Sequence, residues 1–339
     1  MKVTTFGLDL AKRVFQLHWV EMETGEICRR QLKRCEVAEF FANREPAVIA
    51  MEACGSAHYW GRKLAGLGHE VKLIAAQFVR PFVKSNKTDA ADAQAIWEAV
   101  QRPGMKFVCV KSEGQQGVLT MHRMREQLVK MRTMQVNQLR GLLYEFGADL
   151  PQGRQRGMAR VADELTRLED SLSAMVIDAV RQQLKRIEDL DRDIVDIEKK
   201  LALWKKEDKS VKKLMGIPGV GLLTATAAVA TIGNAKAFRS GREFAAFAGL
   251  VPRQSGTGGR VKLLGISKRG DVYLRTLLIH GARSVIMHQK ERAPWLEKLL
   301  ARRPHNVAAV ALANKMARTI WALLAHDRTY QKGYVASAA

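Results

Sequence analysis

Four acidic residues stand where their carboxylates could converge on divalent metal ions. Asp9 lies near the end of the apolar segment FGLDLAK, and Glu52 lies near the end of IAMEACG. Asp89 and Asp92 follow in TDAADAQ at i and i+3, a spacing that places them on one helix face. Two divalent ions about 3.5–4 Å apart promote phosphodiester transfer, and magnesium prefers carboxylate oxygens. The pattern predicts a magnesium site whose metal ligands and catalytic acids are these four residues.

Each acid also has an ordinary structural interpretation when it is taken alone. An acid at a strand end is commonly solvated, and Asp89 in a first helical turn complements the helix dipole. The catalytic interpretation is favoured because these features occur together: two apolar strands each end in an acid, and a helix begins with two more acids. The cations before that helix, Arg80, Lys84 and Lys87, are predicted to contact nucleic-acid phosphates, with a solvated loop as the alternative.

A serine in the last third of the chain could supply a nucleophile. Ser255 lies in the predicted flexible loop PRQSGTGGR, between Arg253 and Arg260. A serine hydroxyl can attack a phosphodiester if it is activated and the phosphate is neutralised. Turn chemistry is the alternative, because Ser beside Gly is common in turns. Ser240 and Ser267 are the other candidates for this role, and Lys268, Arg269 and Arg275 are predicted phosphate contacts, with Arg283 on the same helix.

The elements that must position the acids follow an α/β order. Residues 3–10, 14–22 and 26–33 are expected to form three successive strands. A helix over 36–43 then precedes a strand over 47–53, a second helix and a strand over 70–76. A last helix begins after Thr88, which is a suitable N-cap. Three antiparallel strands followed by β-α-β crossovers are typical of an RNase H-like α/β domain.

The remainder of the chain is predicted to be mainly helical. Residues 113–207 contain two long polar helices on either side of a break at 147–153, with the near-heptad pattern of an antiparallel hairpin or coiled coil. Such an arm could be a spacer or a dimerisation element. Beyond it, LMGIPGVGLLTATAAVATIG has the pattern of a helix-hairpin-helix, in which Gly219 and Gly221 expose backbone N–H groups to phosphate. The alternative is a helical hairpin whose glycines permit close packing in a core.

Composition and charge favour a polyanionic partner. The chain of 339 residues has 56 Lys and Arg against 34 Asp and Glu, which gives a net charge of +22. Most of this excess lies beyond residue 210. No apolar run suggests a membrane span or a signal peptide, and the four cysteines lack C-x-x-C spacing and are interpreted as structural. Three parts are predicted: residues 1–110 with the acids, 111–210 as a helical arm, and 211–339 as a basic domain.

The motifs together resemble a known family. GLDLAK, MEACG and NKTDAADA, followed by GIPGVG, FAGLVPRQSGTGG and SKRGDVYLRTLL, are similar to the DEDD transposases of the one-hundred-and-ten family of insertion sequences, the bridge-RNA-guided DNA recombinases. The resemblance implies a RuvC-like domain and a C-terminal transposase domain. It implies that Asp9, Glu52, Asp89 and Asp92 are the acidic residues and Ser255 the nucleophile. It also implies a structured guide RNA that pairs with donor and target DNA.

The sequence therefore predicts a cytoplasmic, nucleoid-associated recombinase with no membrane partner. It would act on double-stranded donor and target DNA as a homodimer or tetramer, because recombination joins two duplexes. Two other functions stay open on the residues alone. A junction-resolving nuclease of the RuvC type would need the acids and water but no serine. A non-catalytic nucleic-acid-binding protein would use the basic third and leave the acids as capping residues.

Overall fold

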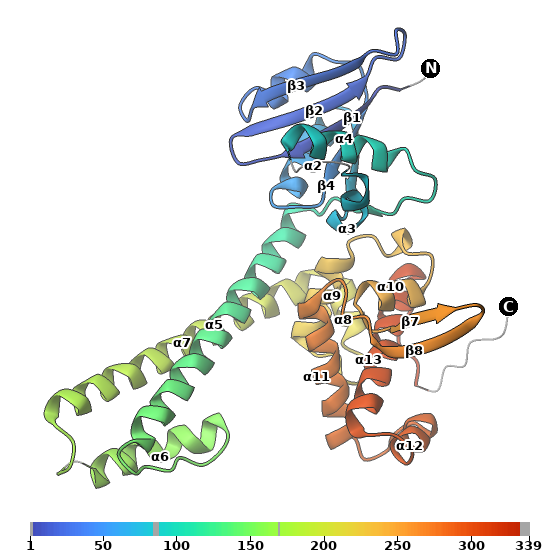
Figure 1. Cartoon of the computed structure of the whole chain (residues 1–339). Coiled ribbons are helices and arrows are strands. Elements are labelled where there is room, and N and C mark those ends of the chain that lie inside the picture. The colour runs from blue at the N-terminus through green and yellow to red at the C-terminus, as the bar shows by residue number, and fades with distance from the viewer. Residues whose placement is uncertain (1–2, 84–87, 169, 333–339) are drawn as a thin grey trace. The chain divides into compact units, whose positions relative to one another are not determined.

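The computed structural model describes residues 3–83, 88–168 and 170–332, and it contains two compact units (Figure 1). The first comprises residues 1–116 and 230–243, and the second comprises residues 117–229 and 244–339. The first unit holds a six-stranded sheet and the second is mainly helical. The predicted division into three functional parts remains a prediction.

The sheet of the first unit has the strand order β3-β2-β1-β4-β5-β6. β1 pairs antiparallel with β2 and parallel with β4, and β4 pairs parallel with β5. The expected order of three strands and two crossovers is therefore confirmed, and β6 is a short edge strand that the sequence did not reveal. The strands are β1 (Thr5–Leu10), β2 (Val14–Val20), β3 (Ile27–Lys33), β4 (Val48–Glu52), β5 (Glu70–Ile74) and β6 (Phe107–Val108).

Helices cover both faces of this sheet. One face packs Phe6, Leu8 and Phe15 against α1 (Val37–Ala42) and α2 (Ala57–Gly66). The other face packs Ala50 and Ile74 against α4 (Asp89–Val100). Because side chains alternate along a strand, β1 directs Phe6 and Leu8 to the first face and Gly7 and Asp9 to the second. The remaining short helices are α3 (Ala76–Val79), η1 (Arg80–Phe82), η2 (Ala235–Ala237) and α10 (Gly241–Phe247), of which α10 continues into the second unit.

Gly7 allows α4 to lie directly on β1. A Cβ atom at this position would lie 2.3 Å from the carbonyl oxygen of Ala93 and 2.8 Å from Cβ of Trp97. The Trp97 indole Nε1 also donates to the Thr5 carbonyl at 3.1 Å, which fixes the helix on the strand. Asp89 lies one turn before Ala93 and Asp92 directly precedes it, so the approach at Gly7 determines how far both acids are from Asp9.

Gly7→Ala is therefore expected to reduce transposition at least 100-fold while leaving most of the fold intact. The added methyl must displace α4, and a displacement of about 1 Å at a catalytic group costs on the order of 100-fold in rate. Transposition frequency and thermal unfolding of purified protein measure the two effects. Gly66→Ala is the matched control, because a Cβ there would have no neighbour within 4 Å. Wild-type activity of Gly7→Ala would show that the α4 approach does not position the acids.

In the second unit, two long helices pair antiparallel. Arg125 of α5 (Glu113–Tyr144) contacts Glu198 of α7 (Ala174–Glu207) at 2.7 Å, and Arg132 contacts Asp191 at 2.5 Å. As the position on α5 rises, the partner on α7 falls, as in a helical hairpin. A helix absent from the prediction, α6 (Arg154–Arg167), joins their shared apolar core at the far end of the pair (Figure 1). Supercoiling and a dimerisation role for this arm remain predictions.

The second unit also contains α8 (Lys209–Leu214), most of α9 (Leu222–Ile232), α11 (Val272–His288), α12 (Pro294–Leu300) and α13 (His305–Ala325). A buried histidine ties α5 to this group, because the ring nitrogens of His122 lie 3.0 Å from the hydroxyls of both Tyr273 and Thr226. Burial lowers the pKa of His122 to about 4, so it is neutral at physiological pH. Among the described helices, α13 alone is long and apolar enough to cross a membrane; it packs on α11 with an apolar face buried, as a core helix does.

The segment expected to be a flexible loop around Ser255 is instead an antiparallel β-hairpin, which corrects that prediction. Its strands are β7 (Pro252–Thr257) and β8 (Arg260–Ile266), joined by Gly258 and Gly259. Both glycines have positive φ, 56° and 80°, which suits a two-residue hairpin turn. The glycine-rich composition suggested a loop, whereas the two glycines in fact form the turn and the flanking residues pair as strands.

Candidate active site

Asp9 and Glu52 lie at the same edge of the sheet. They follow Leu8 and Met51, which are partners in the parallel pairing of β1 and β4. Both side chains are half-buried. Because neighbouring parallel strands end at one edge, the two carboxylates emerge from adjacent strands on the face that α4 covers. The predicted placement of these two acids at one sheet edge is thus observed.

The other two acids occupy the first turn of α4. The Thr88 hydroxyl accepts a hydrogen bond from the Ala91 N–H at 3.2 Å, which confirms Thr88 as the N-cap. Asp89 is exposed and Asp92 is half-buried. The cap fixes where the helix starts, and the contact at Gly7 fixes how close it lies to β1. Together these features bring the first turn of α4 to the edge that carries Asp9.

The pKa of Asp9 depends on its burial and on the charges of the other three acids. Burial, followed by the negative charges of Asp92, Asp89 and Glu52, raises the pKa of Asp9 to about 6. No described Lys or Arg forms an ion pair with Asp9, Asp89 or Asp92. The charges of acids from β4 and α4 therefore act on Asp9.

This donor set has the chemistry of a divalent-cation site with an open arrangement. All four groups offer hard oxygen ligands, and a bound cation would relieve the repulsion that raises the pKa of Asp9. Among residues 3–83, 88–168 and 170–332, no three His, Cys, Asp or Glu side chains are already close enough to enclose a metal ion. Of the nearby predicted phosphate contacts, Arg80 is exposed in η1, while Lys84 and Lys87 lie outside the described residues.

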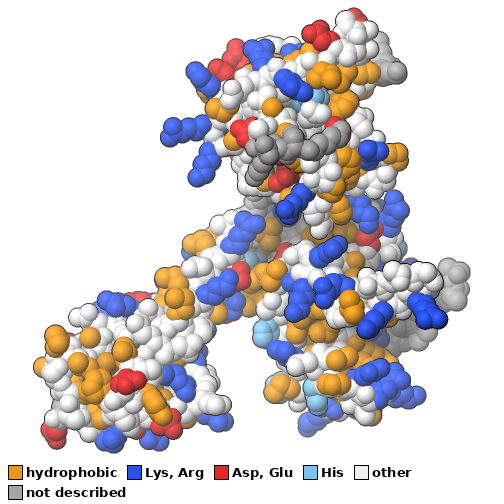
Figure 2. Space-filling model, viewed as in Figure 1, with side chains coloured by type: hydrophobic (Ala, Val, Ile, Leu, Met, Phe, Trp, Pro, Cys, Tyr) orange, Lys and Arg blue, Asp and Glu red, His pale blue; other side chains and the backbone are white. Residues whose placement is uncertain are grey.

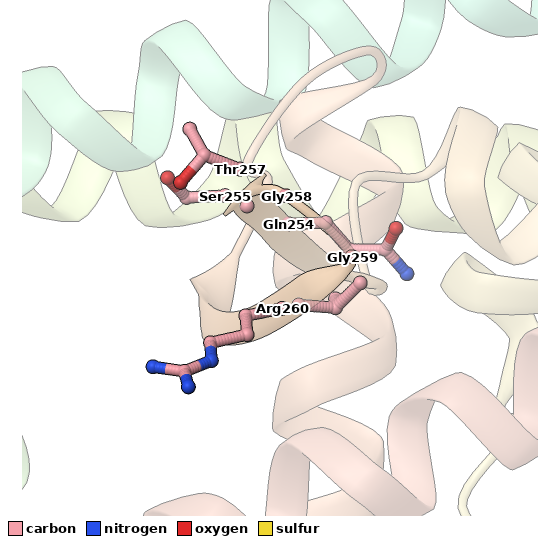
Figure 3. A pocket seen from close by; sticks show the side chains of 8 residues that line it. Gln254, Ser255, Thr257, Gly258, Gly259 and Arg260 are labelled. Carbon is pink, nitrogen blue, oxygen red and sulfur yellow. The ribbon is translucent and has the colours of Figure 1, made fainter.

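Ser255 lies on an exposed face of the β7–β8 hairpin together with cations. It pairs across the hairpin with Lys262, and Thr257 pairs with Arg260. Directly paired residues of antiparallel strands point to the same side, so this face carries two hydroxyls and two cations. Figure 3 shows the side chains of Ser255 and Thr257 directed to one side and Gln254 to the other. A pocket of about 270 Å³ follows the hairpin tip from Gln254 to Val261.

The register adds Lys262 and Thr257 to the residues suggested by the sequence. Lys262 lies opposite Ser255 only because of the hairpin pairing, and Thr257 lies on the same side because it is two residues further along β7. Arg253 is exposed beside an irregularity in β7, and Lys268 and Arg269 are exposed beyond β8. Figure 2 shows Lys and Arg side chains gathered over the region of α10 and this hairpin. An exposed cationic surface of this kind suits a phosphate backbone.

The structure also separates Ser255 from the two other serine candidates. Ser240 accepts a hydrogen bond from the Glu243 N–H at 3.3 Å, so it acts as an N-cap for α10. Ser267 accepts one from the Arg269 N–H at 3.4 Å within a tight turn. The Ser255 side chain is exposed and has no comparable bond to a described residue. Of the three serines, Ser255 therefore has the hydroxyl that is most accessible to a substrate.

Arg275 does not lie where phosphate could reach it, which corrects its predicted role. It is 7% exposed, and its Nη1 donates to the carbonyls of Ala248 and Arg269, each at 3.0 Å. These bonds hold the segments that flank the hairpin, so Arg275 positions the hairpin base. Arg283 is engaged with Asn306 at 3.0 Å.

The Gly-rich turn between α8 and α9 has one packed glycine and one open glycine. A Cβ on Gly219, whose φ is 82°, would lie 2.7 Å from the Gly281 carbonyl oxygen on α11. Gly219 thus serves close packing in the core. A Cβ on Gly221 would meet nothing within 4 Å, so its backbone is open on that side. A phosphate contact at this turn remains a prediction for Gly221, and the helix-hairpin-helix assignment is likewise a prediction.

A mixed sheet with acids at one edge and a mainly helical remainder define an RNase H-like DEDD transposase architecture. Comparison with known proteins agrees: residues 6–147 match a transposase family of the DEDD type, and residues 211–296 match the transposase family IS116/IS110/IS902. The chain is 48% identical to a probable family 20 transposase of Pseudomonas aeruginosa, over 98% of this chain and 100% of that protein.

Two further relatives carry insertion-sequence names. The transposase for insertion sequence element IS1111A of Coxiella burnetii is 42% identical, over 98% of this chain and 92% of its own length. The transposase for insertion sequence element IS1328 of Yersinia enterocolitica is 40% identical, over 97% of this chain and 99% of its own length. The chain belongs to the IS110 family of transposases.

Proposed function

We propose that this transposase cuts and rejoins DNA with magnesium held by Asp9, Glu52, Asp89 and Asp92 and with Ser255 as the nucleophile. The observation that carries the metal site is the mutual influence of four carboxylates from β1, β4 and α4 on the pKa of Asp9. Bound magnesium would supply charge relief on the phosphate oxygens. The side chains of Asp9 and Glu52 would hold it at the sheet edge, and the α4 acids would close the site from above.

The chemistry proposed for Ser255 is a balanced transesterification. Its oxygen attacks phosphorus and loses its proton, a serine–phosphate ester forms, and one DNA sugar oxygen leaves as a hydroxyl. Attack by a hydroxyl of the recipient strand then reverses the exchange and frees the serine. Lys262 and Arg260, on the same hairpin face, would neutralise the phosphate. The number of phosphodiester bonds is conserved, so rejoining needs no external energy source.

The proposal includes donor and target duplex DNA as substrates and a structured guide RNA as a partner, in a homodimer or tetramer. The family membership supports the DNA substrate. The net charge of +22 supports polyanionic partners in general. Copurified RNA, identified by sequencing, tests the guide-RNA part, and its absence from active protein would remove that part alone.

Glu52→Gln tests the metal-site proposal directly. The variant keeps the size of the side chain but loses its charge. We therefore expect the rate of cleavage of element-end DNA in magnesium to fall at least about 1,000-fold, as it does when an enzyme loses a principal catalytic group. Binding to the same DNA should change less than about threefold. Glu45→Gln, an exposed acid of the same unit, is the control.

The products of the wild-type reaction separate the alternatives. Protein-linked ends support the transesterification, whereas free ends formed by water indicate a junction-resolving nuclease that uses the same acids. Binding without scission in any divalent metal indicates a non-catalytic protein. Full activity of Glu52→Gln would contradict the assignment of this acid as a ligand.

A further inference from the structure

A second, cationic pocket lies on the sheet unit, on the face opposite α4. Its volume is about 650 Å³. It forms where the β1–β2 turn and the end of β3 meet α2. Five exposed cations line it, and none of them forms an ion pair with a described acidic residue: Lys12, Arg13, Lys33, Arg34 and Lys63. No acidic residue of the described part of the chain lines this pocket, which we call the basic pocket, so it is suited to phosphate.

Two aromatic residues of α2 give the basic pocket a second kind of contact. Tyr59 is 46% exposed, a large fraction for an aromatic side chain in a pocket. Trp60 is 2% exposed, and its Nε1 donor is buried without a hydrogen-bond partner among the described residues. Trp60 is therefore the packed support beneath the pocket, and its nitrogen is not exposed to a ligand. The pocket thus combines cations and an open ring.

The rings and cations are already held in place. Tyr59 packs edge-on against Trp60 with their centroids 5.5 Å apart and their planes at 86°. Arg34 lies 5.4 Å over the Trp60 ring, as does Lys63. Both cations are also exposed, so they can contact a ligand while they rest on the ring. The geometry is therefore formed before any ligand binds, which reduces the entropic cost of binding.

We infer that the basic pocket binds an unpaired nucleotide of a single-stranded nucleic-acid segment, with its base stacked on Tyr59 and its phosphates on the surrounding cations. An open aromatic ring beside a cationic groove is the arrangement used for single strands, since every base has a stacking face. A duplex keeps its bases stacked inside and cannot offer that face. The volume also falls within the range of pockets for small molecules rather than for a duplex.

The location gives this binding a role in the proposed reaction, on which this part of the inference rests. Lys12 and Arg13 follow β1 directly, only a few residues after Asp9. A strand whose phosphate lies at Asp9 would pass the β1–β2 turn to reach the basic pocket. The pocket would then hold an unpaired strand next to the cut, whether that strand is displaced DNA or a loop of the guide RNA.

Photocrosslinking of the full-length protein tests the inference at the site itself. The probes are single-stranded oligonucleotides of about 12 nucleotides, within the length that such surfaces bind. The DNA probe carries 5-iododeoxyuridine, and the RNA probe carries 5-iodouridine. We expect the peptide that contains Tyr59 to be crosslinked by a single-stranded probe, and much less by the same sequence in a duplex. Crosslinking by the DNA identifies a DNA strand as the occupant, and crosslinking by the RNA identifies an RNA loop.

Binding measurements with variants supply the magnitudes. Tyr59→Ala should weaken single-strand binding about 5- to 100-fold, while Tyr59→Phe keeps the stacking ring and should bind as wild type does. The double variant Lys12→Ala/Lys63→Ala should flatten the slope of log affinity against log salt by about 1.4 for two lost phosphate contacts. The controls are Tyr144→Ala, an exposed tyrosine on α5, and Lys185→Ala/Arg186→Ala, exposed cations on α7.

Failure of this inference can be told apart from failure of the proposed function. Glu52→Gln should crosslink at Tyr59 as wild type does, because Glu52 does not line the basic pocket. Equal crosslinking by duplex and single strand, no crosslink at Tyr59, or unchanged binding by Tyr59→Ala would each overturn the inference. None of these outcomes would affect the carboxylate site.

Discussion

Asp9→Asn is expected to abolish strand transfer and, at the same time, to stabilise the metal-free protein. The loss of activity follows from removing a charged oxygen ligand at the sheet edge, and it should exceed about 1,000-fold. The gain in stability follows from the raised pKa of Asp9, because its ionised form suffers from burial and from three neighbouring acids. A partly solvated group realises only part of this cost, so we expect about 1–2 kcal/mol.

Thermal unfolding and a magnesium titration check the two halves of this result. Unfolding of the sheet unit should shift upward by about 3–6 °C in Asp9→Asn without metal. Magnesium or manganese should stabilise the wild type and the exposed-acid control Glu23→Gln, but not Asp9→Asn. A variant that is less stable than wild type without metal, or that still responds to magnesium, would contradict the proposed arrangement.

The effect of Asp9→Asn should also depend on pH. The pKa of Asp9 is 3.8 when unperturbed and about 6 in the fold, so between these values the folded state holds a proton that the unfolded state has lost. The unfavourable contribution of Asp9 is therefore fully present above pH 6 and vanishes as the pH falls toward 4. The stability advantage of Asp9→Asn should therefore shrink as the pH falls from 6 to 4. Stabilisation of the wild type by metal should also weaken as the pH falls, since the metal needs the ionised carboxylate.

Ser255→Ala is expected to eliminate the covalent protein–DNA adduct and to reduce recombination at least 1,000-fold, because no other atom of that side chain can attack phosphorus. The hairpin should remain folded, since the Ser255 side chain is exposed and alanine fits β-strand backbone angles. Denaturing gels of the trapped reaction measure the adduct, and circular dichroism measures the fold.

Two further variants control for the nucleophile assignment. Ser267→Ala removes a turn hydrogen bond and Ser240→Ala removes a helix cap, and both should retain the adduct with at most about 2 kcal/mol lost in stability. An adduct that persists in Ser255→Ala and disappears in one of these variants would transfer the role to that serine. Loss of recombination with retention of the adduct would give Ser255 a place in rejoining only.

The order of strands and helices in the first unit was predictable because local patterns determine it. The short apolar segments that became β1 and β2 and the cap at Thr88 act over a few residues, and the structure contains all of them. The acids were predictable because Asp9 and Glu52 lie near the ends of strands and Asp89 and Asp92 lie in the first turn of a helix. The short strand β6 and helix α6 were not apparent, since a two-residue edge strand has no periodicity and the highly charged α6 lacked a start signal apart from Gly153.

By itself, the sequence determined the types of residue that can do chemistry and the elements that carry them, because these depend on composition and short-range periodicity. Tertiary structure alone decided their distances. Gly7 admits α4 to β1, and that contact brings the acids of α4 near Asp9. Hairpin pairing, rather than sequence proximity, places Lys262 opposite Ser255. Arg275 is buried where it bonds the carbonyls of Ala248 and Arg269, in the segments that flank the hairpin. Long-range pairing and burial bring together residues far apart in the chain, which is why the basic pocket around Tyr59 emerged only from the fold.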